Sequence, residues 1–329
     1  MVTTVDYHTA GEPFRIVTGG VDPIPGATIL DKRRHAQEHL DDVRALLVNE
    51  PRGHADMYGC FVTEPVAEGS DLGVVFFHNA GFSTACGHGT IALATYALEA
   101  GVLPLRAPET ELRIDVPSGT LPVTASVRQG RIQAVRFCNV PSFVHSAGIQ
   151  VDTSRGRLTV DVAYGGAFYV SVHAQDAGLE VEPGSLPRLI ELGREIKRAV
   201  EAQAEIVHPE EPELRDVYGV IFFADEAERP LAQRNVAVFA DGEVDRSPCG
   251  SGTSARLALL HRQGRLGVGD VLLHRSIVGT EFEGRIVEAV DVAAGPAVVT
   301  EVGGSAHLTG RHEFVLEADD PLGTGFLLR

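Results

Sequence analysis

Cys86-Gly87-His88-Gly89-Thr90 opens the apolar stretch 91–98 and decides how the first half of the chain is interpreted. A short apolar run over residues 72–77 precedes it and is typical of a buried strand. Residues 90–99 are rich in Ala and Leu, with apolar side chains on all sides, which predicts a buried central helix. Cys86 would lie at its N-terminus, where unpaired backbone N–H groups and the dipole favour a thiolate and a bound carboxylate. The alternative is a tight glycine turn with an inert buried cysteine.

The same pattern occurs a second time, with Cys249 lying 163 residues after Cys86. Cys249-Gly250-Ser251-Gly252-Thr253 opens another apolar helical stretch and follows the apolar run 236–239. The pairs Gly119-Thr120 and Gly279-Thr280 extend the repeat beyond the cysteines. A repeat at half the chain length predicts two related α/β halves, each with one thiol at a helix N-terminus. Two thiols facing one small ligand would suit proton removal on one face of a carbon and delivery on the other.

The repeat also predicts how the chain is divided. We expect a first α/β half over residues 1–145, completed by C-terminal strands at about 305–329, and a second half over 146–304. The connection between the halves is expected near residues 141–148.

Hydrophobic periodicity and turn residues predict the secondary structure. In the first half, strands are expected at 3–7, 14–17, 59–64, 72–77, 112–116, 120–127 and 131–137, with helices at 28–48 and 88–99. In the second half, strands are expected at 158–164, 167–173, 217–224 and 234–240, with helices at 186–204 and after Cys249. The tail is expected to hold strands at 305–309 and 312–316 and a turn at 319–322.

Composition limits the class of protein. The 329 residues, 44% of them hydrophobic, are enough for one large core or two smaller ones. No apolar run approaches the roughly 18 residues of a membrane span, and the first residues lack the pattern of a signal peptide. Four cysteines are too few for a disulfide framework, which favours a reduced, cytoplasmic setting. The net charge of −17 disfavours nucleic acid or an anionic membrane as a partner, and a homodimer is compatible with the sequence.

Other chemistries find little support in the residue spacings. Cys86 and His88 could supply two metal ligands, but no Cys-x-x-Cys or His-x-x-x-His spacing completes a site, so no metal is expected. The chain has neither the Gly-x-Ser-x-Gly elbow of a serine hydrolase nor a nucleotide-binding glycine loop. Pyridoxal chemistry needs a Schiff-base lysine, and the two lysines, Lys32 and Lys197, lie among charges where we expect them to be solvated. No cofactor is therefore expected.

The remaining cysteines and one acidic residue have simpler interpretations. Cys60 and Cys138 lie in strand patterns without glycine turns, which favours core packing. Asp245-Arg-Ser-Pro248 precedes Cys249 and could be a turn that sets the entry to the helix. An acidic residue four positions from a thiol at a carboxylate site is also suited to holding a substrate ammonium group.

Several longer motifs resemble those of the proline racemase superfamily, which includes proline racemases, hydroxyproline 2-epimerases and trans-3-hydroxy-L-proline dehydratases. The likeness extends over essentially the whole chain. Besides the two cysteine blocks, it rests on His8-Thr-Ala-Gly-Glu-Pro13, Glu50-Pro-Arg-Gly-His54, Asp56-Met-Tyr-Gly59, Tyr164-Gly-Gly166, Asp245-Arg-Ser-Pro-Cys-Gly250 and Asp320-Pro-Leu322.

The resemblance implies a fold and a mechanism. The fold would be like that of diaminopimelate epimerase: two pseudo-symmetric α/β subdomains, each a curled mixed sheet round a central helix, with the active site in the cleft between them. Catalysis would need no cofactor: the thiolate of one cysteine, Cys86 or Cys249, takes the Cα proton while the opposite thiol donates one. Backbone N–H groups at two helix N-termini would stabilise the charge that develops on the carboxylate.

The same resemblance implies substrate contacts, residue by residue. The carboxylate of proline or a hydroxyproline would lie against the backbone N–H groups of Gly87, His88, Gly250 and Ser251. The ring nitrogen would contact His88 and Asp245. Tyr58 and Phe239 would form walls around the ring.

Within the superfamily, the presence of both Cys86 and Cys249 favours a racemase or epimerase, since dehydratases of the resembled types lack one or the other. The segment 162–169 and the tail 323–329 are nevertheless similar to the dehydratase branch, and Ala85 replaces the methionine usual before the first cysteine. A trans-3-hydroxy-L-proline dehydratase therefore stays an alternative. So does a protein that binds proline without turnover or senses redox state through its thiols.

Overall fold

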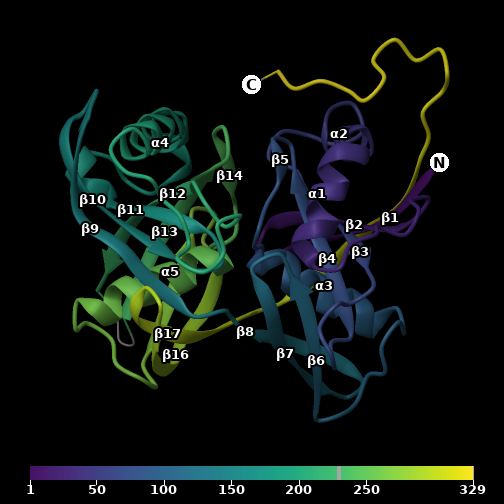
Figure 1. Cartoon of the computed structure of the whole chain (residues 1–329), viewed down its shortest axis with the longest axis horizontal. Helices are drawn as coiled ribbons and strands as arrows, with labels where there is room; N and C mark the ends of the chain where they lie inside the picture. The colour runs from purple at the N-terminus through teal and green to yellow at the C-terminus, as the bar shows by residue number, and fades with distance from the viewer. Residues whose placement is uncertain (228–230, 329) are drawn as a thin grey trace. The chain divides into compact units, whose positions relative to one another are not determined.

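The computed structural model describes residues 1–227 and 231–328 and divides into two compact units (Figure 1). One unit comprises Met1–Val135 and Ser305–Arg329, and the other comprises Arg136–Gly304. The C-terminal segment returns to the first unit because its strand pairs with the first strand of the chain. Arg329, the last residue of the predicted C-terminal segment, lies outside the described residues.

The sheet of the first unit is mixed, with strand order β18–β1–β2–β3–β4–β6–β7 and the short β5 paired to β4. The pairs β2–β3 and β4–β6 are parallel and the others are antiparallel. The strands are β1 (Val2–Thr9), β2 (Glu12–Gly19), β3 (Tyr58–Thr63), β4 (Leu72–His78), β5 (Gly81–Phe82), β6 (Glu109–Val116), β7 (Gly119–Arg128) and β18 (Ala306–Phe314). β8 (Arg131–Cys138) leads on into the second unit.

The central helix of the first unit is α3 (Gly87–Glu99), which packs against β1, β2, β3, β7 and β18. Almost every side chain of α3 is buried, as its Ala- and Leu-rich sequence predicts. Because strands from both ends of the sheet order contact this helix, the sheet curls around it.

The helix predicted over 28–48 is instead two helices, α1 (Ile29–His39) and α2 (Asp41–Val48). Thr28 caps α1 through a capping box with Asp31. Leu40 leaves the helical conformation, with φ −123° and ψ 11°, and the acidic residues that follow it begin α2. Acidic side chains suit a helix N-terminus because they interact favourably with its dipole, so the break has a physical reason.

The expectation that both lysines are solvated is wrong for Lys32. This residue of α1 is buried, and its Nζ donates a hydrogen bond to the carbonyl oxygen of Glu64 at 2.7 Å. Lys197 is half-buried and donates to the carbonyl of Ala240 at 3.1 Å. Each ammonium group is thus compensated by a backbone oxygen.

The sheet of the second unit closes on itself. Its order is β9–β10–β11–β12–β13–β15–β16–β17, and β17 pairs back to β9; the pairs β11–β12 and β13–β15 are parallel. The short β14 pairs with β13. The strands are β9 (Ser142–Thr153), β10 (Gly156–Tyr164), β11 (Phe168–His173), β12 (Val217–Glu226), β13 (Leu231–Phe239), β14 (Glu243–Asp245), β15 (Val271–Ser276), β16 (Glu281–Val292) and β17 (Gly295–Gly304).

Two helices pack on opposite faces of this sheet. The buried α5 (Gly250–Arg262) contacts β9, β10, β11, β16 and β17, and Figure 1 shows it among these strands. α4 (Leu186–Glu201) contacts β9, β12 and β13, and the short 3-10 turns Ala174–Ala177 and Pro183–Ser185 precede it. Along β12, Ile221 lies against α5 at Gly252, whereas the next residue, Phe222, lies against α4. The alternation of a strand thus gives each helix its own apolar surface.

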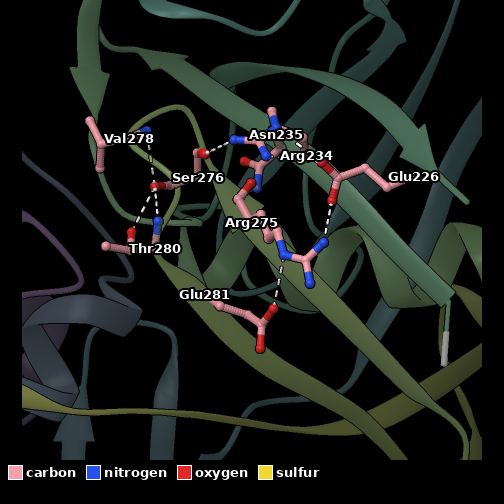
Figure 2. A network of polar contacts seen from close by, with 8 residues as sticks. All are labelled: Glu226, Arg234, Asn235, Arg275, Ser276, Val278, Thr280 and Glu281. Carbon is pink, nitrogen blue, oxygen red and sulfur yellow. Dashed lines mark hydrogen bonds and ion pairs between the residues drawn. The ribbon is translucent and has the colours of Figure 1, made fainter. Parts of the chain in front are cut away.

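A network of polar contacts ties β12, β13, β15 and β16 together (Figure 2). Glu226 accepts hydrogen bonds from Arg234 at 3.1 Å and from Arg275 at 2.7 Å. Arg275 also donates to Glu281 at 3.0 Å. Arg234 and Asn235 donate to the carbonyl oxygens of Ser276 and Arg275, which links β13 to β15, where the strands run parallel.

The predicted fold class, two α/β units that each wrap a curled mixed sheet round a central helix, is confirmed. The segment near 141–148, expected to be a connection, forms part of β9, and one strand, β18, replaces the two expected in the tail. β15, β16 and β17 were not predicted. Over the described parts of the chain, no helix is both long and apolar enough to cross a membrane.

Candidate active-site residues

Cys86 is the N-cap residue of α3, as the sequence predicts. Its backbone is extended, with φ −154° and ψ 99°, and its side chain is 5% exposed. The backbone N–H of Gly89 donates to Cys86 Sγ at 3.3 Å, and the hydroxyl of Thr90 donates to the Cys86 carbonyl at 2.8 Å. The sulfur therefore takes the place of a capping oxygen at the positive end of a helix, which favours its ionised form.

His88 lies beside this sulfur and is enclosed by aromatic rings. Its Nε2 is 3.4 Å from Cys86 Sγ. The rings of Tyr58 and Phe14 meet the imidazole edge to face, with centroid distances of 5.0 Å and 5.5 Å. Tyr58 is itself fixed by a hydrogen bond to the hydroxyl of Ser83. The imidazole is thus held where it can donate a hydrogen bond to the sulfur.

Gly89 allows this close arrangement. A Cβ at this position would lie 2.4 Å from the ring of Phe14 and 2.7 Å from Cys86 Sγ. A larger residue at position 89 would clash with both the Phe14 ring and the thiol, so the predicted motif needs glycine there.

Cys249 is the N-cap residue of α5, but its backbone differs from that of Cys86. Its φ of 63° is positive and its ψ is 97°. For a residue other than glycine, such a conformation costs on the order of 1–3 kcal/mol and is often found at functional sites. Three hydrogen bonds hold it: Cys249 N donates to Ser247 Oγ at 3.1 Å, and the Cys249 carbonyl accepts from Thr253 N at 2.7 Å and from Thr253 Oγ1 at 2.8 Å.

The Cys249 sulfur is buried and lies near the carboxylate of Asp245. Removal from water is the main cause that raises the pKa of the Cys249 thiol, and the charge of Asp245 raises it further. Burial also raises the pKa of Asp245 to about 6, although this carboxylate accepts a 2.8 Å hydrogen bond from the backbone N–H of Ser247. The protonated thiol is therefore favoured at Cys249.

Each unit brings together the predicted residues that belong to it. In the first unit, Gly87 and His88 form the first turn of α3 behind Cys86, with Tyr58 against the imidazole. In the second unit, Gly250 and Ser251 begin α5, Asp245 ends β14, and Phe239 ends β13. The ring of Phe239 stacks on that of Tyr218 at 5.4 Å.

Sequence reasoning missed two residues beside the thiols. Phe14 of β2 contacts Gly89 and His88, and Tyr169 of β11 contacts Cys249 and Ser251. Both are fully buried aromatic residues in strand patterns, so the sequence carries no signal that separates them from ordinary core. In residues 1–227 and 231–328, no group of three or more His, Cys, Asp or Glu side chains could hold a metal ion.

Comparison with known proteins identifies the family. The family model described as proline racemase matches residues 4–327. The chain belongs to the proline racemase family.

Three members of this family illustrate the range of known relatives. A 3-hydroxyproline 2-epimerase of Burkholderia multivorans and a trans-3-hydroxy-L-proline dehydratase of Burkholderia cenocepacia are each 46% identical over 329 residues, covering 100% of this chain and 98% of the relative. The crystal structure of a hydroxyproline epimerase from Agrobacterium vitis, with bound trans-4-hydroxy-L-proline, superposes with a TM-score of 0.92. It is 34% identical, and the match covers 99% of this chain and 95% of that one. Family membership thus leaves epimerisation and dehydration as the two reactions to separate.

Proposed function

We propose that this protein is a cofactor-independent racemase or epimerase that inverts the Cα of proline or a hydroxyproline, with Cys86 and Cys249 as the acid/base pair. The observation that carries the proposal is the equivalence of the two thiols. Each is the N-cap residue of the buried central helix of its unit, and each lies at the same place in the internal repeat. An enzyme that inverts a carbon needs one group to remove a proton and a second group to return it.

In the proposed reaction, the thiolate of one cysteine takes the Cα proton, and the electron pair of the C–H bond moves into the carboxylate. The thiol of the other cysteine then gives its proton to the opposite face of Cα, so that the two residues exchange protonation states. Burial and the charge of Asp245 favour the thiol form of Cys249, so we assign Cys86 as the first base. In this state the enzyme can catalyse the reverse reaction. For another turnover in the same direction, Cys249 regains a proton from water and Cys86 loses one to water.

The binding roles follow from donors and charge. Backbone N–H groups of Gly87, His88, Gly250 and Ser251 would receive the carboxylate, because the first N–H groups of a helix have no intrahelical partner. These donors would also stabilise the enediolate charge as Cα loses its proton. Asp245, together with His88, would contact the ring nitrogen. Tyr58 and Phe239 would enclose the ring.

Dehydration of trans-3-hydroxy-L-proline is the second candidate, and the 46% identical Burkholderia dehydratase supports it. Cys86 would again remove the Cα proton, but the ring hydroxyl would leave as water. No proton would return to Cα. This reaction requires one thiol base, whereas epimerisation requires two acid/base groups.

A substrate panel separates the candidates. The purified protein is incubated with L-proline, trans-4-hydroxy-L-proline and trans-3-hydroxy-L-proline, and the products are analysed by chiral chromatography together with an assay for pyrroline. We expect Cα epimers from at least one substrate. Pyrroline from trans-3-hydroxy-L-proline without any epimer would establish the dehydratase instead, and binding without turnover would contradict both enzymatic readings.

A further inference from the structure

The hydroxyl of Tyr169 lies between Cys249 and Ser251. Tyr169 Oη is 3.5 Å from Cys249 Sγ and 2.7 Å from Ser251 Oγ. The residue belongs to β11 and is completely buried. Its ring meets Tyr218 edge to face at 5.7 Å, and β11 is held between β10 and β12. The phenol therefore has little freedom to leave the sulfur.

The first unit places a different residue in the corresponding position. β2 is the second strand of a hairpin and runs parallel to β3, as β11 is the second strand of a hairpin and runs parallel to β12. Phe14 on β2 contacts the first turn of α3, as Tyr169 on β11 contacts the first turn of α5. Phenylalanine has no hydroxyl to offer a sulfur.

The first turns of the two central helices, α3 and α5, also differ. In the first unit, His88 of the helix puts Nε2 within 3.4 Å of Cys86 Sγ. The equivalent position in the repeat is Ser251, whose hydroxyl is paired with Tyr169. A polar group thus accompanies each sulfur, supplied by the helix in the first unit and by the strand in the second.

We infer that Tyr169 is a positioning residue for Cys249. The phenolic hydroxyl of Tyr169 changes its hydrogen bonds when the thiol ionises, and it accompanies the Cys249 sulfur as His88 accompanies the sulfur of Cys86. This inference rests on the proposed function in taking Cys249 to be an acid/base group. When Cys249 is protonated, its S–H donates to Asp245 or to Tyr169 Oη, and the phenol donates to Ser251. When Cys249 is ionised, the phenol rotates its hydrogen to the thiolate and accepts from Ser251.

The electrostatics agree with this arrangement. Burial and the charge of Asp245 raise the pKa of Cys249, while the hydrogen bond from Tyr169 acts to lower it. A thiolate at this position would lie away from water beside a carboxylate, so a directed donor is worth more there than at the surface. Without the phenol, the ionised form of Cys249 would lose an important stabilising contact.

Tyr169→Phe tests the inference, because it removes one oxygen and leaves the ring in place. The rate of iodoacetamide alkylation is measured for Cys249 and Cys86 separately, by peptide mass spectrometry over a range of pH. We expect the alkylation midpoint of Cys249 to rise by about one pH unit, which is roughly tenfold slower reaction at a pH below it. The profile of Cys86 should stay unchanged. Epimerisation should fall mainly in kcat, with its pH profile displaced upward.

Tyr164→Phe is the matched control. It removes another buried tyrosine hydroxyl from the same β10–β11 hairpin, and among the described residues that hydroxyl has no hydrogen-bond partner. We expect it to leave both alkylation profiles unchanged. Thermal unfolding of both variants shows whether they are folded.

Replacing Tyr169 by 3-fluorotyrosine provides a second test that does not remove the hydroxyl. The more acidic phenol is a stronger donor, so the Cys249 midpoint should move downward. A Cys249 profile that neither variant displaces would overturn the inference. Alkylation requires no turnover, so a protein inactive on every proline derivative would refute the proposed function while this test still decided the role of Tyr169.

Discussion

Cys86 and Cys249 occupy the same position in two related units, yet their surroundings differ. In both, a threonine four residues later donates to the cysteine carbonyl at 2.8 Å, and a glycine three residues later lies against the sulfur. The backbone φ is −154° at the first cysteine and 63° at the second. The frame of the helix N-terminus is therefore shared, while the neighbours of each sulfur are not.

The difference teaches how one repeated unit can serve two chemical roles. His88 adjoins the first sulfur, whereas Asp245 and Tyr169 adjoin the second, where burial favours the protonated thiol. In the proposed reaction, an acid and a base must be present together at the start of each turnover. Neighbours that push two equivalent thiols toward different protonation states would meet this requirement.

The largest effect is expected for Cys86→Ser, which should reduce both epimerisation and dehydration by on the order of 10³-fold or more. A serine hydroxyl is far too weakly acidic to serve as an ionised base near neutral pH. Rates are measured on the substrate panel, with Cys138→Ser in β8 as a matched control that should retain activity. Full activity in Cys86→Ser would show that the first thiol is not an acid/base group.

Asp245→Asn should remove a pH-dependent cost to folding. Burial raises the folded-state pKa of Asp245 to about 6. The protonated carboxyl tolerates burial, so its contribution to stability is fully present below the unfolded pKa of 3.8. This contribution is lost as the pH rises through about 6, because the buried group then ionises. Asparagine keeps an oxygen for the Ser247 N–H. The variant should therefore gain up to about 3 kcal/mol over the wild type above pH 6 and almost nothing near pH 3.

This prediction is checked by chemical denaturation of both proteins between pH 3 and 8. A stability difference that does not change with pH would contradict it. In the same variant, Cys249 should react faster with iodoacetamide, since the neighbouring negative charge is gone.

A pair of variants, Gly89→Ala and Gly252→Ala, compares the space available beside the two sulfurs. The added Cβ would lie 2.7 Å from Cys86 Sγ in the first variant and 2.8 Å from Cys249 Sγ in the second. Displacing a reacting group by a fraction of an ångström can cost about 10²-fold in rate. Gly89→Ala should lose more, because its Cβ also meets the ring of Phe14 at 2.4 Å, whereas the Cβ at Gly252 meets only the terminal methyl group of Ile221 at 2.8 Å.

Steady-state kinetics of the two glycine variants check this order. Gly184→Ala is a suitable control, since its Cβ would meet no atom nearer than 3.4 Å. Equal activity in all three variants would mean that neither glycine is needed to place a thiol.

The smallest effects are expected for Thr90→Val and Thr253→Val. Each loses one hydrogen bond to a cysteine carbonyl, worth about 1 kcal/mol. Thr253 also bonds to Nδ1 of the fully buried His274 at 2.8 Å, so its removal leaves that imidazole without this partner. Thr253→Val should therefore lower the free energy of unfolding by about 1–3 kcal/mol, measured by denaturation. Equal losses in the two variants would contradict this difference.

The sequence predicts the central helices and most strands of the first unit because apolar residues and glycine turns mark them directly. The break at Leu40 was not predictable, since neither Pro nor Gly interrupts the pattern and leucine favours a helix. The burial of Lys32 depends on the carbonyl of Glu64, which lies 32 residues away in the chain. Such tertiary contacts leave no local signal.

The same reasoning explains which residues of the candidate site could be predicted from the sequence. A thiol followed by Gly-x-Gly-Thr has few structural explanations, so both N-cap cysteines could be located from the sequence. Tyr169 could not, because Ala-Phe-Tyr-Val-Ser-Val is an ordinary strand pattern and the partners of its hydroxyl are 80 or more residues away. In the second unit, β16 was not predicted, although Phe282 and Ile286 alternate with charged residues in a strand pattern.

Cys249→Ser tests the central claim most directly, because it separates a reaction that needs two thiols from one that needs a single thiol. Epimerisation and pyrroline formation are measured side by side for the wild type and the variant on the same three substrates. The account predicts that the wild type epimerises and that the variant loses epimerisation by on the order of 10³-fold or more with every substrate, even where some dehydration of trans-3-hydroxy-L-proline persists. A wild type that only dehydrates this substrate, at a rate Cys249→Ser leaves unchanged, would contradict it.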